Sequence, residues 1–191
     1  ATLVVSADAK SKVYGESDPE LTYRAPAVVG DEAPAFTGAL ERDPGEEVGP
    51  YAINQGDLAM ADNEETGFKA SNYTLKYNGA TLEITDKSIS AGQDMTVDAP
   101  KDETYNGSEH KWAPTVKDGD ETLVEGEDYT VAYADAEGNE KTDFTNVTGK
   151  IVVTITGVGN YTGSVERTYQ ITPATLVVSA DAKSKVYGES D

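Results

Sequence analysis

The 191-residue sequence contains no cysteine, one histidine, one tryptophan and two methionines. Without cysteine the chain has neither a disulfide framework nor a thiolate for zinc or redox chemistry. It has no apolar run of the roughly 18 residues that a membrane span needs, so we expect no segment that inserts into a membrane. Basic residues are also scarce: 15 Lys and Arg stand against 35 Asp and Glu, for a formal net charge of −20. Such a surface repels nucleic acid phosphates, and we expect no nucleic acid partner.

Reactive groups are equally scarce. His110 is the only histidine, and it lies in a turn-like stretch, residues 107–111, where nothing marks a nucleophile for it to activate. Pairs of carboxylates for glycoside hydrolysis arise by chance among 35 acidic residues, and small β-domains offer little cleft. We therefore expect no enzyme activity, no catalytic residue and no required cofactor.

What the sequence does contain is a perfect repeat. Residues 1–18, ATLVVSADAKSKVYGESD, return unchanged as residues 174–191, so the period is 173 residues. Identity over 18 positions indicates recent duplication within a tandem array. An array of this kind favours a function that scales with copy number over one that needs a single tuned active site.

Each period also contains two weaker half-repeats. NYTLKYNGATLEIT begins at Asn72 and NYTGSVERTYQIT begins at Asn160. We therefore predict one domain at residues 1–86, a second at residues 87–173, and the first strand of the next repeat at residues 174–191. Pro173 restricts the backbone at the junction between residue 172 and the next repeat, and this predicts stiff joints and an elongated rod. The last 18 residues, apart from their own domain, are expected to add as an edge strand to the second domain or to another molecule.

Alternation of apolar and polar residues predicts β-strands along most of the chain. It is clearest at residues 73–77, 151–155 and 165–171, and turn sequences such as Asn78-Gly79 separate the runs. No stretch carries a convincing helical pattern. We therefore predict an all-β protein of two tandem small β-sandwich, Ig-like domains, with a β-grasp-like first domain as the alternative.

The first half-repeat carries a series of recognisable motifs. They are VYGESDPELTY from Val13, FTGALER from Phe36, GEEVGPYAI from Gly45 and NYTL from Asn72. In this order they resemble the MBG domain of the YGX type, although the acidic stretch before Asn72 is longer than that pattern usually has. The second half-repeat is similar to a bacterial Ig-like repeat, through a motif such as TLVEGEDYTVAY from Thr122.

This resemblance implies a tandem-repeat adhesin that is secreted and displayed at the bacterial cell surface, attached to the cell wall or otherwise held there. Two roles remain open. In the first, the repeats form a stalk that projects an adhesive tip. In the second, the repeats themselves bind mucin or other host glycans weakly, and copy number supplies avidity. Neighbouring repeats of the same chain are partners in both cases.

Four aromatic residues are candidates for stacking against sugar rings, the usual way in which a β-rich module holds a carbohydrate. They are Trp112, Tyr105, Tyr14 and Tyr23. Packing in a core or between domains is the alternative for each of them.

Two further kinds of site are weighed against simpler interpretations. Oxygen-rich loops at residues 62–65, 118–121 and 135–140 are candidates for Ca²⁺, but none has the spacing of an EF-hand, and acidic hairpin turns are the alternative. Lys12 and Lys150 are candidates for a lysine isopeptide cross-link, against the alternative of surface lysines.

Overall fold

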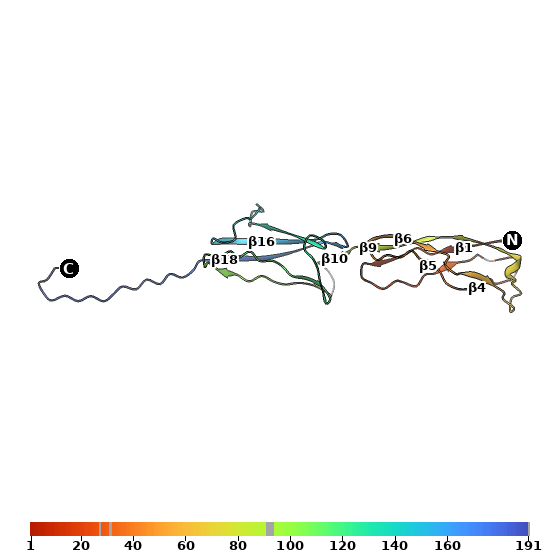
Figure 1. Ribbon diagram of the computed structural model, residues 1–191, viewed down its shortest axis with the longest axis horizontal. Coiled ribbons are helices and arrows are strands. Elements are labelled where there is room, and N and C mark those ends of the chain that lie inside the picture. The colour runs from red at the N-terminus through yellow and green to blue at the C-terminus, as the bar shows by residue number, and fades with distance from the viewer. Residues whose placement is uncertain (27, 31, 91–93, 191) are drawn as a thin grey trace. The chain divides into compact units, whose positions relative to one another are not determined.

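The computed structural model describes residues 1–26, 28–30, 32–90 and 94–190 (Figure 1). These residues form β-strands and one 3₁₀ turn, η1 (Ala70–Asn72), and the described part of the chain contains no α-helix. The all-β prediction is therefore confirmed. The chain divides into two compact units. Unit 1 comprises Ala1–Val97, Thr115–Val131 and Ile155–Val165, and unit 2 comprises Asp98–Pro114, Ala132–Thr154 and Glu166–Asp191.

The strands are short and follow one another closely. In chain order they are β1 (Thr2–Ala7), β2 (Lys10–Val13), β3 (Tyr23–Arg24), β4 (Ala35–Thr37), β5 (Glu41–Arg42), β6 (Gly49–Asn54), β7 (Ala59–Ala61), β8 (Thr74–Asn78), β9 (Ala80–Thr85), β10 (Lys87–Ser88), β11 (Met95–Val97), β12 (Glu103–Thr104), β13 (Val116–Asp118), β14 (Glu121–Thr122), β15 (Tyr129–Ala134), β16 (Thr148–Gly157), β17 (Tyr161–Thr162) and β18 (Ser164–Thr172).

Two parallel ladders join the start of the first half-repeat to its end. β1 pairs with β8 over five positions, beginning with Thr2 opposite Thr74, and β2 pairs with β9 over four, beginning with Lys10 opposite Leu82. The two ladders belong to different sheets, of strand order β3-β1-β8 and β2-β9-β6-β5. The chain therefore passes from the first of these sheets to the second at two places, between β1 and β2 and between β8 and β9.

The second change of sheet falls at the turn predicted for Asn78-Gly79. This turn does not close a hairpin, because β8 and β9 lie in different sheets. A Cβ atom on Gly79 would come within 2.9 Å of the carbonyl oxygen of Ile53 on β6. The backbone can cross from one sheet to the other at this point because the residue has no side chain.

Apolar side chains from both sheets form the core of the first half-repeat. Leu3 and Val5 on β1, Ile53 on β6, and Leu82 and Ile84 on β9 are each at most 1% exposed. Exposed polar residues alternate with Leu82 and Ile84 along β9. Burial of each such side chain stabilises the fold by about 1.5–3 kcal/mol.

The second half of the chain contains a four-stranded sheet of order β12-β18-β16-β15 and a three-stranded sheet of order β11-β13-β14. The alternation predicted for β16 and β18 is confirmed, since Ile151, Val153 and Ile155 are buried on β16 and Tyr169 and Ile171 on β18. Parallel pairing recurs here, between β10 and β17 and between β12 and β18.

Residues 174–190 form no strand, although they repeat the sequence of β1 and β2. Leu176 and Val178 are 86% and 85% exposed, whereas their counterparts Leu3 and Val5 are 1% and 0% exposed. The predicted addition of this segment to the edge of the second domain is therefore wrong for the residues that the structure describes. The first copy is held by β8 and β9, whereas residues 174–190 pair with no described strand.

Candidate functional site

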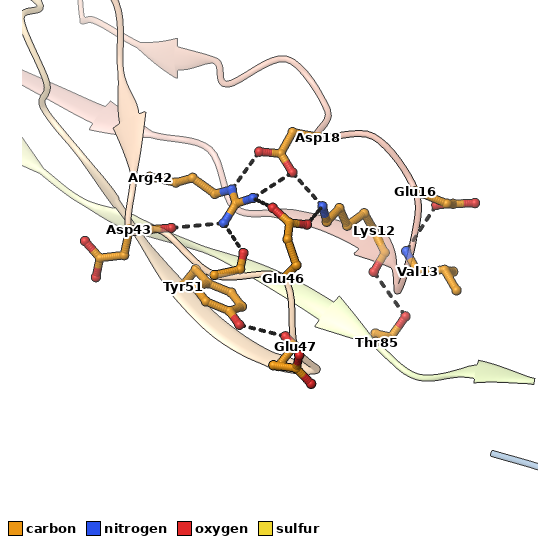
Figure 2. Close-up of polar contacts among 11 residues, drawn as sticks. Lys12, Val13, Glu16, Asp18, Arg42, Asp43, Glu46, Glu47, Tyr51 and Thr85 are labelled. Atoms are coloured by element: carbon orange, nitrogen blue, oxygen red, sulfur yellow. Dashed lines mark hydrogen bonds and ion pairs between the residues drawn. The ribbon is translucent and has the colours of Figure 1, made fainter. Parts of the chain in front are cut away.

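Four charged side chains meet in unit 1: Lys12, Asp18, Arg42 and Glu46, which we call the charge cluster (Figure 2). Lys12 lies on β2, Asp18 in the loop after β2, Arg42 on β5, and Glu46 in the loop between β5 and β6. β2 and β5 are the two outer strands of their sheet. The cluster therefore connects the loops beside both edges of one sheet.

Lys12 occupies an inward position of β2, and its side chain is only 3% exposed. Its Nζ atom lies 2.7 Å from Oδ1 of Asp18 and 2.5 Å from Oε2 of Glu46. A buried ammonium group is costly unless it is paired and hydrogen-bonded. The two carboxylates meet that requirement, so a lysine can stand where an inward strand position would otherwise be apolar.

Arg42 binds the same two acids. Its Nε and Nη2 atoms donate to the two carboxylate oxygens of Asp18 at 2.6 and 3.1 Å, and Nη2 also contacts Oε1 of Glu46. Nη1 donates to the carbonyl oxygens of Asp43 and Gly45 at 3.0 and 2.5 Å. The planar guanidinium group suits such bidentate pairing, and here it also fixes the loop that follows β5.

Gly45 allows that loop to close over the cluster. Its φ is 140°, and a Cβ atom on it would lie 2.3 Å from Cε1 of Tyr51. The ring of Tyr51 lies 5.4 Å, centroid to guanidinium carbon, from Arg42, and its hydroxyl donates to the carbonyl oxygen of Glu47 at 2.8 Å. Glycine is therefore required both by the backbone conformation and by the close approach of the ring.

The cluster keeps its members ionised. Hydrogen bonds from Arg42 and then Lys12 lower the pKa of Asp18 to about 2. Hydrogen bonds from Lys12 and then Arg42 lower the pKa of Glu46, and those to Asp18 and Glu46 raise the pKa of Lys12. The hydrogen bond to Asp18 is also the main cause that raises the pKa of Arg42. Two cations and two anions thus balance in charge near neutral pH.

This ionised state determines what Lys12 can do chemically. An amide cross-link to Asp18 would need a neutral amine as the nucleophile and a protonated carboxyl group that loses water. The hydrogen bonds favour the opposite form of each group. The arrangement favours reversible ion pairing over condensation. Lys150, the other cross-link candidate, is exposed on the surface.

A second group of contacts in unit 1 is centred on Asn160, just before β17. Its Nδ2 atom donates to Oε2 of Glu47 at 2.5 Å, and its Oδ1 atom accepts from the main-chain N–H of Val48 at 2.9 Å. Its carbonyl oxygen accepts from the N–H of Lys87, the first residue of β10, at 3.0 Å. Asn160 therefore connects the segment before β17 to the loop at residues 47–48 and to the first residue of β10.

Tyr161, the next residue, packs its ring edge-on against Tyr14 with the ring centroids 5.5 Å apart. Its hydroxyl donates to Oδ2 of Asp118 at 3.3 Å, and Lys87 pairs with Oδ1 of the same carboxylate at 2.6 Å. Burial, and next the charge of Asp118, raise the pKa of Tyr161. A shallow groove of about 520 Å³ lies beside this tyrosine pair, and Glu16, Glu46, Asp94, Asp118 and Glu121 are among its lining residues.

The four aromatic residues predicted to stack on sugars are divided between the two units. Tyr14 packs on Tyr161, and Tyr23 packs edge-on against Phe36 at 5.3 Å between ring centroids, both in unit 1. Trp112 and Tyr105 belong to unit 2.

Trp112, like Tyr14, lies beside a depression in the surface. It is partly exposed and lines a depression of about 260 Å³ together with His110, Lys111 and Tyr169. Its main-chain N–H donates to the Tyr169 hydroxyl at 3.2 Å, and the Tyr169 hydroxyl donates to the carbonyl oxygen of His110 at 2.9 Å. The surroundings of Trp112 are thus held by hydrogen bonds, and Tyr105, 39% exposed, is not among the residues that line this depression.

In each loop considered for Ca²⁺, at least one carboxylate is engaged within the protein, as Asp118 is by Lys87 and Tyr161. Asp62 accepts from the N–H of Ala70 at 2.9 Å and pairs with Lys69. Asp135 accepts from the main-chain N–H groups of Glu137 and Asn139, in the manner of an acidic turn. Within residues 1–26, 28–30, 32–90 and 94–190, no group of three or more His, Cys, Asp or Glu side chains is arranged to hold a metal ion.

Sequence reasoning missed the roles of Asp18, Arg42 and Glu46. One signal was available: the strand pattern places Lys12 on the inward face of residues 10–13, and an inward lysine needs acidic partners. The pattern does not say which of the 35 acidic residues those partners are.

Comparison with known families supports the resemblance drawn from the motifs of the first half. Residues 3–83 match the MBG domain (YGX type), a domain typical of bacterial surface repeat proteins. Nothing identifies the second segment, for which the Ig-like resemblance stays a prediction. No curated protein and no solved structure is significantly similar to the chain. None of the described residues belongs to a helix long and apolar enough to cross a membrane.

Proposed function

From the MBG domain at residues 3–83 we propose that this chain is a non-catalytic, load-bearing stalk segment of a bacterial adhesin, displayed outside the cell. In this role it transmits force between the cell surface and an adhesive tip. One observation carries the proposal: the first strands of the MBG segment pair in parallel with its last strands.

Parallel pairing decides how the segment responds to tension. A force on a tandem chain enters at the start of β1 and leaves at the end of β9. Because β1 runs parallel to β8, and β2 to β9, this force slides the paired strands past each other. The hydrogen bonds of a ladder then share the load and must break together. Antiparallel strands pulled from the same end lose their hydrogen bonds one at a time.

The second half-repeat has the same arrangement. Its first strand, β10, pairs in parallel with β17, which immediately precedes β18. β18, the last strand, also pairs in parallel with β12. Both half-repeats therefore present a parallel, shear-loaded ladder to a force along the chain.

The charge cluster supports the same role. β2 has a single neighbouring strand, β9, in its sheet. Lys12 anchors β2 additionally to Glu46 and Asp18, and Arg42 binds both acids from β5 on the opposite edge. Sliding of β2 along β9 thus has to separate the buried Lys12 ammonium group from its two partly exposed carboxylates, as well as to break main-chain hydrogen bonds.

Single-molecule force spectroscopy tests this proposal with a matched pair of pulling directions. The chain has no cysteine, so attachment points can be placed freely. Attachment through A1C and D86C loads the parallel ladders in shear. Attachment through V48C and D86C pulls the antiparallel strands β6 and β9 apart from one end, where Gly49 lies opposite Ile84.

We expect a higher peak force with the first pair than with the second at the same pulling speed. Equal peak forces, or a lower peak for the first pair, would reject the load-bearing role while leaving the fold unaffected.

A second candidate function rests on the depression around Trp112. Each repeat would hold a mucin or other host glycan weakly there, with avidity from copy number. Binding of the chain to immobilised mucin and to a glycan panel tests it. If Trp112 stacks on a sugar, W112A abolishes binding and W112F retains most of it. Equal binding by the two variants counts against a stacking site.

A further inference from the structure

We propose that Asn106, in the loop after β12, is a site of spontaneous covalent modification. In this reaction the main-chain nitrogen of Gly107 displaces the side-chain amide of Asn106, and His110, the only histidine of the chain, polarises the group that is attacked. All three residues belong to unit 2. The inference does not depend on load bearing, because it concerns one loop and is tested on the free chain in solution.

The side-chain oxygen of Asn106 accepts two hydrogen bonds. The main-chain N–H of Ser108 donates to Oδ1 at 2.8 Å, and Nε2 of His110 lies 3.0 Å from the same atom. Because an amide oxygen can only accept, Nε2 carries the proton in this contact. Two donors on a carbonyl oxygen make its carbon more electrophilic, and they stabilise the negative charge that develops on the oxygen when a nucleophile adds.

The imidazole ring of His110 is held in this orientation. Its other nitrogen, Nδ1, faces the carboxylate of Glu103 on β12 at 3.7 Å, and the side chain is only 11% exposed. The main-chain N–H of His110 donates to the carbonyl oxygen of Phe144 at 2.8 Å, and its own carbonyl oxygen accepts from the Tyr169 hydroxyl at 2.9 Å. Contacts on both sides of the ring thus direct Nε2 towards Asn106.

The nucleophile is the main-chain nitrogen of the next residue. Gly107 has a φ of 83°, and a Cβ atom placed on it would meet nothing within 4 Å. Glycine adopts this conformation without strain and has no side chain beside its nitrogen to hinder ring closure. Because the nitrogen and the Asn106 amide belong to adjacent residues, the attack is intramolecular and needs no encounter between molecules.

The reaction balances with water as its co-reactant. The nitrogen of Gly107 forms a bond to Cγ of Asn106, and the bond from Cγ to Nδ2 breaks. The amide nitrogen leaves as ammonia and takes the proton of the Gly107 N–H with it. The product is a cyclic succinimide, and water opens it at either carbonyl carbon to give aspartate or isoaspartate.

The chain contains a second Asn-Gly pair, Asn78-Gly79, in different surroundings. Asn78 lies on β8 in register with Ser6, and its Nδ2 atom donates to the Ser6 hydroxyl at 3.2 Å. This contact engages the nitrogen that would leave and does not polarise the carbonyl group. Gly79 is confined by the carbonyl oxygen of Ile53, 2.9 Å from where a Cβ would lie. We therefore expect the same dipeptide to react slowly there.

The modification changes the loop beside the depression around Trp112, which His110 also lines. A carboxylate replaces the neutral amide that faces His110. In the isoaspartate product the main chain is also longer, although the loop is fixed to Thr172 through the N–H of Tyr105 and to Phe144 through that of His110. We therefore expect the modified loop to differ from the original in both charge and shape.

The experiment compares the two Asn-Gly pairs within one molecule. The full chain is incubated at neutral pH, either folded or in urea, and both sites are followed by peptide mass spectrometry with enzymatic detection of isoaspartate. In the folded chain we expect Asn106 to react faster than Asn78 by on the order of tenfold. In urea we expect the two rates to be equal and Asn106 to react more slowly than in the folded chain. Equal rates in the folded chain, or a faster reaction of Asn106 in urea, would overturn the inference.

Variants of His110 separate its effect from that of the dipeptide. H110F removes the donor but keeps an aromatic ring, and we expect it to slow Asn106 to the rate seen in urea without changing Asn78. H110Q keeps an N–H donor and is expected to react at an intermediate rate. The matched control is K101A, which alters another residue of the depression and should leave both rates unchanged. A folded H110F variant with the original rate at Asn106 would contradict the proposal. If H110F does not fold, the comparison of the unsubstituted chain with and without urea decides it.

Discussion

Lys12 and Glu46 stand 34 residues apart in the sequence, and their side chains meet at 2.5 Å. One side chain is 3% exposed and the other 64% exposed, so the pair reaches from the interior of the sheet to solvent. The contact joins an edge strand to a loop on the far side of the same sheet. Its consequences for stability are measurable one residue at a time.

Replacement of Lys12 by methionine removes the buried ammonium group and keeps a side chain of similar length. Removing one partner of a buried ion pair typically costs about 3–5 kcal/mol, but both carboxylates here remain solvated, so we expect a loss of about 1–2 kcal/mol. Urea unfolding at neutral pH measures it. K76M, at an exposed position of β8, is the control, and the idea fails if the two variants are equally stable.

Acid is expected to weaken the cluster in a defined range. The folded state lowers the pKa of Asp18 from 3.8 to about 2, so its contribution is complete well above the ordinary value and is lost as the pH falls towards about 2. Since the side chain is 42% exposed, we expect about 1 kcal/mol of stability to disappear over this range. Urea unfolding at a series of pH values measures it, and D18N should show a flatter dependence. A curve of unchanged slope for D18N would assign the effect to other acids, such as Glu46, whose pKa the cluster also lowers.

Alkali acts in the opposite direction through Lys12. Hydrogen bonds to Asp18 and Glu46 raise the pKa of Lys12, so the stability it contributes is fully present below the ordinary value of 10.5 and is lost as the pH rises through the raised one. We expect K12M to lose less stability than the unsubstituted chain in that range. Urea unfolding from neutral to strongly alkaline pH compares them, and parallel curves would contradict the assignment.

Gly45 offers a test of the loop that closes the cluster. G45A combines a strained backbone with a methyl group 2.3 Å from the ring of Tyr51, and we expect a loss of about 2 kcal/mol or more. Gly149 on β16 has open space where a Cβ would be placed and no positive φ, so G149A should be neutral within about 0.5 kcal/mol. Thermal unfolding of the two variants is a direct comparison, and equal midpoints would count against a required glycine.

Asn160 provides a prediction outside the cluster. N160A removes the side-chain hydrogen bonds to Glu47 and Val48. At about 1 kcal/mol for a typical hydrogen bond, discounted because the amide is partly solvated, we expect a loss of about 1–2 kcal/mol. Urea unfolding measures the loss, and protease cleavage near residue 48 should become faster than in N72A, the exposed asparagine of the other half-repeat. Equal cleavage rates would show that Asn160 does not hold the loop.

How far the sequence predicted the fold can be seen strand by strand. Alternation located β8, β16 and β18, because one side of each strand is more deeply buried than the other. It could not show that β1 runs parallel to β8, since the pattern of a strand is the same whichever neighbour it has. It also could not show that the chain changes sheet at Gly79, because a crossing and a hairpin use similar turn residues.

The candidate site was harder to predict from the sequence than the strands were. The motifs around Tyr14, Phe36 and Gly45 pointed to the MBG domain, and residues 3–83 match it. They did not reveal the contacts of Arg42, because its partners come from loops whose folding depends on the whole segment. Residues 174–190 show the same limit most directly, since a sequence identical to two strands forms none where β8 and β9 are not beside it.

The charge cluster differs from a covalent cross-link in that its contacts are reversible. A covalent bridge, once cut, stays cut unless new chemistry restores it. Lys12, Arg42, Asp18 and Glu46 need only come back together to bind again, because the folded state holds each in the charged form that the others attract. In the load-bearing role that we propose, a tether built from such contacts is expected to yield, release the stored work as heat and regain its length, so that each repeated pull is damped.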